Sequence, residues 1–199
     1  FPAYLGIANQ SIKNANDLVI PEGTEVIWNG RTNNTELLKV NTGDSLFLFK
    51  AAGFRVAKTF KETQNVQFHL TNKQSKQVDT LVYQVEVIKD AYPAIRLSQK
   101  QDSLVKEAVV LEGIAMDDHG LTRLELVTER KKRSSNVPIT ERKVIGGVRG
   151  TKYPVYIKLD INALNLEKEE ELIYYFVVYD NDGVNGPKSA KSTMFSFKA

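Results

Sequence analysis

Apolar residues recur at every second position in short runs along the chain, and clusters of Asn, Gly, Asp and Thr separate the runs. This alternation predicts half-buried β-strands, and the β-branched and aromatic residues in the runs favour strands over helices. The clearest runs are TEVIW, ELLKV, SLFLF, VQFHL and LVYQVEVI, then VVLEGIAM, TRLELVT, PVYIKLDI, IYYFVVY and TMFSFKA. About seven short strands in each half, with regular turn signals, are typical of an immunoglobulin-like sandwich.

The two halves of the chain repeat one another. Phe-Pro-Ala at the start recurs as Tyr-Pro-Ala at 92–94, Glu22-Gly23 recurs as Glu112-Gly113, and VQFHLTNK aligns with YYFVVYDN. A repeat of this kind indicates a duplicated unit. We therefore predict an all-β chain of two tandem immunoglobulin-like β-sandwich domains, 1–90 and 91–199. The second carries a longer basic hairpin at 129–153. Pro93, in KDAYPAI, favours a short, stiff hinge at the boundary.

Composition narrows the classes of function. The chain has 199 residues, a net charge of +3 and no cysteine, which excludes disulfides and cysteine-based metal sites. So small a charge does not favour nucleic acid as a partner. The apolar run from Leu172 to Tyr179 is far shorter than the roughly 20 residues that a membrane-spanning helix needs. Because the chain begins with Phe1, we expect it to be a piece of a longer protein whose anchors lie elsewhere.

Two acidic loops are the strongest candidates for chemistry. Asp117 and Asp118 follow the second predicted strand of the second domain, and Asp180 and Asp182 follow its sixth. In an immunoglobulin-like sandwich these two loops lie at the same end, so four carboxylates converge as candidate calcium ligands. The alternative is turn architecture, since Asp and Asn before Gly hydrogen-bond their own backbone. Alignment on an EF-hand loop leaves both end ligands unmatched, so we favour turns and expect no metal.

Other charged groups support no enzyme. Segment 129–152 holds eight lysines and arginines against two glutamates, which is a candidate patch for an acidic partner but more typical of a solvated hairpin tip. Only two histidines, His69 and His119, occur, so a histidine zinc site is not expected. No nucleophile elbow, phosphate loop or zinc-protease motif is present. We expect no catalytic residue and no cofactor.

The sixth strand of the second domain is apolar on both faces. One face holds Leu172, Tyr174, Phe176 and Val178, and the other holds Ile173, Tyr175, Val177 and Tyr179. One face enters the core, which leaves the other as a candidate surface for a partner. Alternatively, Tyr174 or Tyr175 forms a tyrosine corner and the rest is an ordinary central strand, which is the interpretation we favour. Trp28 is expected in the core of the first domain.

The segments VIPEGTEVIW, KDAYPAI, AMDDHGL and YYFVVYDNDGVNGPKSAKS, in this order, give the chain a resemblance to a known family. It resembles an uncharacterised family, with a domain of unknown function, of large membrane-anchored bacterial envelope proteins that carry tandem immunoglobulin-like domains. The resemblance implies an extracytoplasmic location and no particular activity. Envelope glycoproteins of such bacteria have similar Asp-Ser/Thr-aliphatic acceptors, which makes Ser45, Thr80 and Ser103 candidate glycosylation sites.

Together these features predict a non-enzymatic ectodomain fragment that acts as a structural spacer or a protein–protein interaction module. The expected partner is another envelope protein or another region of the parent protein, with no nucleic acid and with membrane contact only through anchors outside this fragment. The alternatives are a carbohydrate-binding module for polysaccharide capture, which needs several exposed aromatic residues, and a calcium-stiffened adhesion module.

Overall fold

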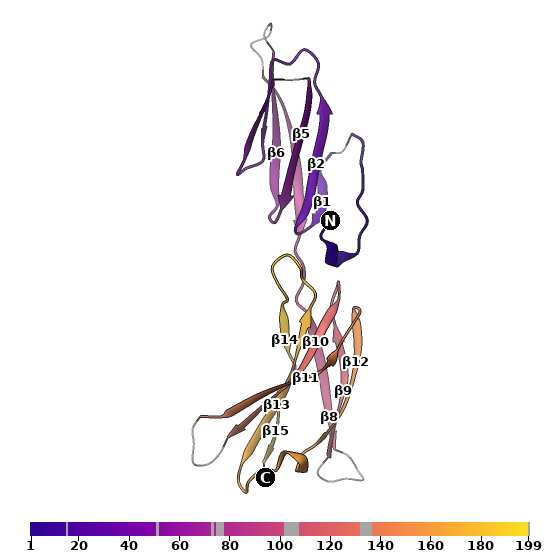
Figure 1. Ribbon diagram of the computed structural model, residues 1–199, viewed down its shortest axis with the longest axis vertical. Coiled ribbons are helices and arrows are strands. Elements are labelled where there is room, and N and C mark those ends of the chain that lie inside the picture. Colours follow the sequence, from indigo (N-terminus) through magenta and orange to yellow (C-terminus); the bar gives the residue numbers. More distant parts are fainter. Residues whose placement is uncertain are drawn as a thin grey trace. The chain divides into compact units, whose positions relative to one another are not determined.

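The computed structural model describes residues 1–14, 16–50, 52–72, 74, 78–101, 108–131 and 137–198. Contacts between residues divide the chain into two compact units, Phe1–Asp90 and Ala91–Ala199. Each unit is built almost entirely of strands, which are labelled in Figure 1. No helix among the described residues has the length and apolar character to cross a membrane.

The first unit is a sandwich of a five-stranded and a two-stranded sheet, ordered β1-β7-β6-β3-β4 and β2-β5. Alternate residues point inward, so Val56 and Phe60 of one sheet meet Val66 and Phe68 of the other in the core. Trp28, predicted in the core, is partly buried and packs against it, with its ring edge-on to Phe60 at 5.7 Å. The elements are the 3-10 turn η1 (Ala3–Leu5), β1 (Leu18–Pro21), β2 (Thr24–Arg31), β3 (Leu37–Asn41), β4 (Leu46–Phe49), β5 (Gly53–Phe60), β6 (Gln64–Thr71) and β7 (Val78–Ile88).

The second unit packs the sheet β11-β10-β13-β14, in which β15 also pairs with β13, against the sheet β12-β9-β8. Its core contains large side chains without solvent contact, among them Leu111, Leu124, Tyr174 and Phe176. The elements are β8 (Ala94–Gln101), β9 (Ala108–Met116), β10 (Leu121–Lys131), β11 (Ile139–Gly147), β12 (Lys152–Asp160), the 3-10 turn η2 (Asn162–Leu164), β13 (Glu171–Asp180), β14 (Ser189–Lys191) and β15 (Phe195–Lys198).

The two units share one strand order, which confirms the predicted all-β, immunoglobulin-like fold. The pair β2-β5 corresponds to β9-β12, and the run β7-β6-β3-β4 corresponds to the run from β14 through β13 and β10 to β11. The first strand differs between the units. β1 runs parallel to β7, whereas β8 runs antiparallel to β9 in the opposite sheet.

One pair of repeated residues is not equivalent in the structure. Gly23 has φ 80° and turns the chain between β1 and β2. Gly113 lies inside β9, where an added Cβ would overlap the backbone carbonyl of Arg96 on β8. A glycine is therefore required at both places, but for a positive φ in the first unit and for close strand approach in the second.

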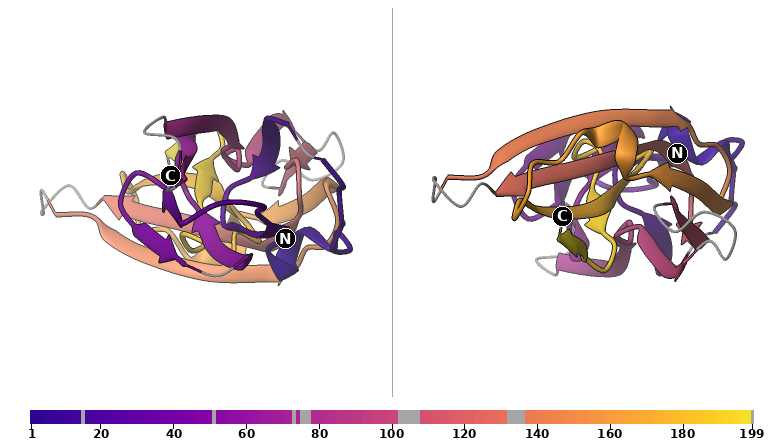
Figure 2. Two further views of the ribbon diagram at one scale, coloured as in Figure 1. Left: turned by 90° about the horizontal axis from the view of Figure 1, so that it is seen from above. Right: turned by 90° about the horizontal axis from the view of Figure 1, so that it is seen from below.

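The basic segment is more than a hairpin tip. Residues 132–136 lie outside the described residues, but β11 is a full strand that pairs with β10 from Ile139 to Gly147. Figures 1 and 2 both show the ends of β10 and β11 next to the turn projecting beyond the sheet β12-β9-β8. The residues of β11 from Ile139 to Ile145 are all exposed.

Candidate interaction surfaces

Asp182 is buried in the loop between β13 and β14, and its described side-chain contacts lie within segment 180–188. Its Oδ1 accepts hydrogen bonds from the Val184 N–H at 2.7 Å and the Asn185 N–H at 3.2 Å. Its Oδ2 accepts a hydrogen bond from Lys188 Nζ at 2.6 Å. Burial by itself raises the pKa of Asp182, but the hydrogen bonds from Lys188 and the two backbone amides outweigh it and lower the pKa below its ordinary value.

Asp180, at the end of β13, is fully buried beside Asp182. Its Oδ1 accepts hydrogen bonds from the backbone N–H groups of Asp182 at 3.1 Å and Lys188 at 2.7 Å, while Oδ2 lies 3.7 Å from Lys188 Nζ. The lysine therefore supplies positive charge to both carboxylates. The sequence predicted both aspartates in this loop; Asp182 lies there, whereas Asp180 is the last residue of β13, and Lys188 was not identified as their partner.

Asp117 and Asp118 lie in the loop between β9 and β10. Asp117 Oδ2 accepts hydrogen bonds from the backbone N–H groups of His119 at 2.9 Å and Gly120 at 2.7 Å, which is a turn-forming arrangement. Asp118 Oδ2 lies 3.4 Å from His119 Nε2. Asn181 Nδ2 donates to the His119 carbonyl at 3.4 Å, so the two acidic loops lie side by side as predicted.

The four aspartates do not assemble into a common cluster. Within the described part of the chain, no three of them bring carboxylate oxygens within 4.8 Å of one another. Asp117 and Asp182 direct carboxylate oxygens to backbone amides in their own loops. The geometry favours turn architecture, and calcium binding stays a prediction that a titration tests.

The outer face of the sheet β11-β10-β13-β14, opposite to the core, carries a second apolar cluster. Val127, Tyr175 and Val177 are at most 3% exposed on this face, with Ile173 and Tyr179 packed against them. A sandwich needs only one buried face per sheet. β13 is therefore largely buried on both faces.

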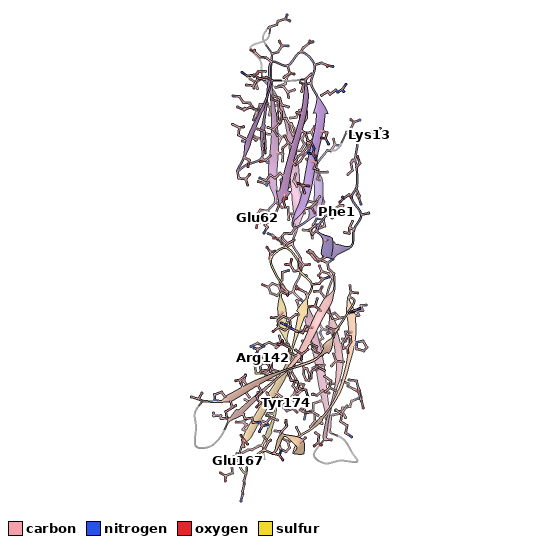
Figure 3. The ribbon with its side chains drawn as sticks, viewed as in Figure 1. Phe1, Lys13, Glu62, Arg142, Glu167 and Tyr174 are labelled. Atoms are coloured by element: carbon pink, nitrogen blue, oxygen red, sulfur yellow. The ribbon has the colours of Figure 1, made fainter. Side chains whose placement is uncertain are left out.

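Glu125 contacts two arginines and one tyrosine hydroxyl on the outer face. Its Oε2 accepts hydrogen bonds from Arg142 Nη1 at 3.2 Å and the Tyr179 hydroxyl at 3.1 Å, and its Oε1 lies 3.1 Å from Arg123 Nε. The Arg123 guanidinium also lies 4.0 Å from the centre of the Tyr179 ring. The hydrogen bond to Glu125 raises the pKa of Arg142 above its ordinary value, so this arginine keeps its charge. Figure 3 labels Arg142 on β11.

Tyr174 and Tyr175 do not form a tyrosine corner, so that part of the favoured interpretation is wrong, although β13 is a central strand between β10 and β14. The Tyr174 hydroxyl crosses the core and donates to Gln99 Oε1 of β8 at 2.6 Å, whereas the Tyr175 hydroxyl donates to Glu129 Oε1 on the outer face at 3.0 Å. Burial raises the pKa of both hydroxyls. Lys191 Nζ lies 5.2 Å from the Tyr175 ring centre, so long basic side chains border the cluster on both sides.

A groove of about 1370 Å³ lies in the first unit between the N-terminal segment and β2. Ile12, Lys13 and Asp17 contribute to one side, and Trp28 and Arg31 contribute to the other. Figure 3 labels Phe1 and Lys13 in this segment. Trp28 is packed among core aromatic rings, so it is not a free platform for a sugar ring.

The remaining predicted positions are scattered. Two tyrosines are strongly exposed in the described residues, Tyr92 before β8 and Tyr156 on β12, each 72%. Ser45 is exposed before β4, and Thr80 is exposed on β7, where its hydroxyl lies 3.0 Å from His69 Nδ1. Ser103 lies outside the described residues. Both described glycosylation candidates are thus accessible, and modification stays a prediction.

No family model and no curated protein matches the chain. Among solved structures, a candidate carbohydrate-binding protein from Bacteroides uniformis is similar with a TM-score of 0.35 and 12% identity, over 93% of this chain and 100% of that one. Fibronectin(III)-like modules of CbhA from Clostridium thermocellum are similar with a TM-score of 0.29 and 15% identity, over 90% of each chain. A DUF3823 family protein from Bacteroides ovatus is similar with a TM-score of 0.30 and 8% identity, over 90% of this chain and 99% of that one. The fold assignment rests on the strand pairing described above.

Proposed function

We propose that the chain is a non-enzymatic spacer and protein-interaction module in the ectodomain of a membrane-anchored bacterial envelope protein, and that its second unit supplies the binding face. The observation that carries the proposal is the second apolar cluster on the outer face of the sheet β11-β10-β13-β14. The envelope setting is supported by the sequence resemblance described above.

The chemistry of the outer face suits a protein partner. Protein interfaces are enriched in tyrosine and arginine at their centres, with polar groups at the rim. The apolar rings of Tyr175 and Tyr179 lie beneath the charged side chains of this face, with hydroxyls hydrogen-bonded to Glu129 and Glu125. The stems of Arg142 and Lys191 can cover apolar surface in the free protein and move aside for a partner, because long basic side chains keep their charges in water.

The buried acidic loop between β13 and β14 supports a structural role. The Asp182 carboxylate, which has a shifted pKa, is neutralised by Lys188 in its own loop and has no nucleophile or general base among its hydrogen-bond partners. A polysaccharide-binding module is less well supported, because the strongly exposed tyrosines lie on separate elements and not on one platform.

Photo-crosslinking in the membrane-anchored parent protein tests the proposal. A photoreactive residue in place of Lys191, on the outer face, is expected to capture a discrete partner protein. The matched control replaces the exposed Tyr156 on β12, in the other sheet, and is expected to capture nothing specific. A partner captured equally from both positions, or from position 156 alone, would refute the assignment of this face. No adduct from either position leaves only the spacer role.

A further inference from the structure

β11 forms one edge of its sheet. It pairs with β10 along one side, and no described residue pairs with it along the other. An edge strand presents a row of unpaired N–H and C=O groups that can hydrogen-bond to a strand of another chain. All residues from Ile139 to Ile145 are exposed, and Val144 is 57% exposed.

The edge strand of equal length in the opposite sheet, β12, is less suited to pairing. It carries Pro154 near its middle, and proline lacks the backbone N–H that a new strand would bind. β11 contains no proline. The backbone of β11 is therefore a better template for an added strand than that of β12.

The side chains of β11 are self-complementary about Arg142. When a two-fold axis perpendicular to the sheet joins two copies edge to edge, the same face of each copy stays on the same side. Opposite residues of an antiparallel pair point to the same face, so the axis must pass through a residue that lies opposite its own copy in the partner. With Arg142 at the axis, Glu141 of each copy lies opposite Lys143 of the other, and Thr140 lies opposite Val144. An axis at 141 or at 143 places Glu141 opposite itself or Lys143 opposite itself, and like charges directly opposite are destabilising.

The axis at 142 brings two copies of Arg142 together, but each already has a carboxylate partner in its own chain. Arg142 Nη1 lies 3.2 Å from Glu125 Oε2 on the outer face, whereas Glu141 and Lys143 point to the opposite face. The pairing of β10 with β11 becomes irregular between Leu124 and Glu125, opposite Gly146 and Val144. Regular pairing of two copies is thus expected to end at Val144.

We infer that β11 pairs antiparallel with β11 of a second copy of this chain, centred on Arg142. The two sheets β11-β10-β13-β14 then form one continuous sheet across the dimer. This inference rests on the proposed interaction role of the second unit. It differs in using the edge strand β11 in place of the outer face, and its partner is a second copy of the chain. Lysine on an edge strand commonly prevents pairing. Here Glu141 of one copy is a counter-ion for Lys143 of the other, and the two lie opposite one another only in the register centred on Arg142.

Charge reversal tests both the pairing and its register. Sedimentation equilibrium of the 199-residue chain is expected to show a mass that rises with concentration toward twice the 22.4 kDa of one copy. E141K alone and K143E alone each place like charges opposite one another at both contacts between residue 141 of one copy and residue 143 of the other. Each should weaken the dimer by at least about tenfold. The double variant E141K/K143E restores opposite charges and should dimerise like the parent chain.

A mixture of the two single variants makes the sharpest test. One copy then carries lysine at both 141 and 143, and the other carries glutamate at both, so the mixture should form a heterodimer although neither variant dimerises alone. Equal thermal unfolding of all variants excludes misfolding. A parent chain that stays monomeric, or single variants that dimerise as the parent does, would overturn the inference. Crosslinks from position 191 to a different protein would survive that outcome, so the proposed function is tested separately.

Discussion

Lys188 Nζ lies 2.6 Å from Asp182 Oδ2 and 3.7 Å from Asp180 Oδ2, in a loop where neither carboxylate is exposed to solvent. Both aspartates also accept backbone hydrogen bonds, so the loop has a fixed internal structure. Buried charges are costly unless they are paired. The stability of the loop therefore depends on the lysine more than on any single turn residue.

Replacing Lys188 by methionine is expected to destabilise the second unit by about 3 kcal/mol, because it leaves two buried carboxylates without their cation. Lys191→Met is the matched control, since Lys191 is exposed and its loss should change the stability by less than about 0.5 kcal/mol. Urea unfolding followed by circular dichroism measures the change. The single tryptophan, Trp28, reports on the first unit, so its fluorescence transition should not move. Equal effects of the two substitutions would contradict the prediction.

The lowered pKa of Asp182 gives the second unit a defined acid sensitivity. A carboxyl group whose folded pKa lies below its unfolded value, near 3.8 here, stabilises the fold at higher pH. That contribution is lost as the pH falls through the folded pKa. Asp182→Asn should therefore be less stable than the parent at pH 7, and the difference should shrink below about pH 4. A difference that is constant from pH 7 to pH 3 would show that the ionised carboxylate contributes nothing.

Calcium is expected to leave the unfolding of the chain unchanged. Both oxygens of Asp182 are occupied by protein donors, and one of those donors is an ammonium group that a cation would have to displace. A site loaded at one hundred times its dissociation constant would stabilise the fold by about 2.7 kcal/mol, so melting curves with calcium and with chelator discriminate clearly. Magnesium is the control. A rise in melting temperature with calcium alone would restore the adhesion hypothesis for this loop cluster.

The sequence predicted the sandwich well because strand period and turn residues are local signals. The bounds of β3, β6 and β13 lie within two residues of the predicted runs. β5 and β11 were not among the clearest runs, because Arg55 and Lys58 in one and Glu141 to Lys143 in the other dilute the apolar pattern. An edge position lets such strands carry charge, and sheet edges are not visible in a local pattern.

The candidate sites were predicted less completely, because their partners are distant in sequence or belong to another strand. The loop positions of Asp180 and Asp182 follow from the fold, but the role of Lys188 depends on how the loop closes. Likewise Glu125 and Arg142 meet across two strands, which requires the register of β10 with β11. The alternation of Glu and Arg on neighbouring strands was a usable signal once those strands were paired.

Gly113→Ala should be strongly destabilising, by roughly 3 kcal/mol or more, because the new methyl group would overlap the backbone of β8 and not a movable side chain. Gly146→Ala on β11 is the matched control within a strand, since no atom lies within 4 Å of the position of its Cβ. Thermal unfolding of the two variants provides the comparison. If both variants melt together with the parent chain, β8 and β9 cannot approach as closely as described.

Glu125→Gln tests the charged cover of the outer face. Glutamine keeps the size of the side chain but offers one acceptor oxygen in place of two, so it cannot serve Arg123, Arg142 and the Tyr179 hydroxyl together. A loss of about 1–3 kcal/mol in the free energy of unfolding is expected, since hydrogen bonds to charged groups contribute in this range. Glu129→Gln is the control, because Glu129 accepts a hydrogen bond from the Tyr175 hydroxyl and is less buried. A larger loss at position 129 than at position 125 would mean that Glu125 does not organise this face.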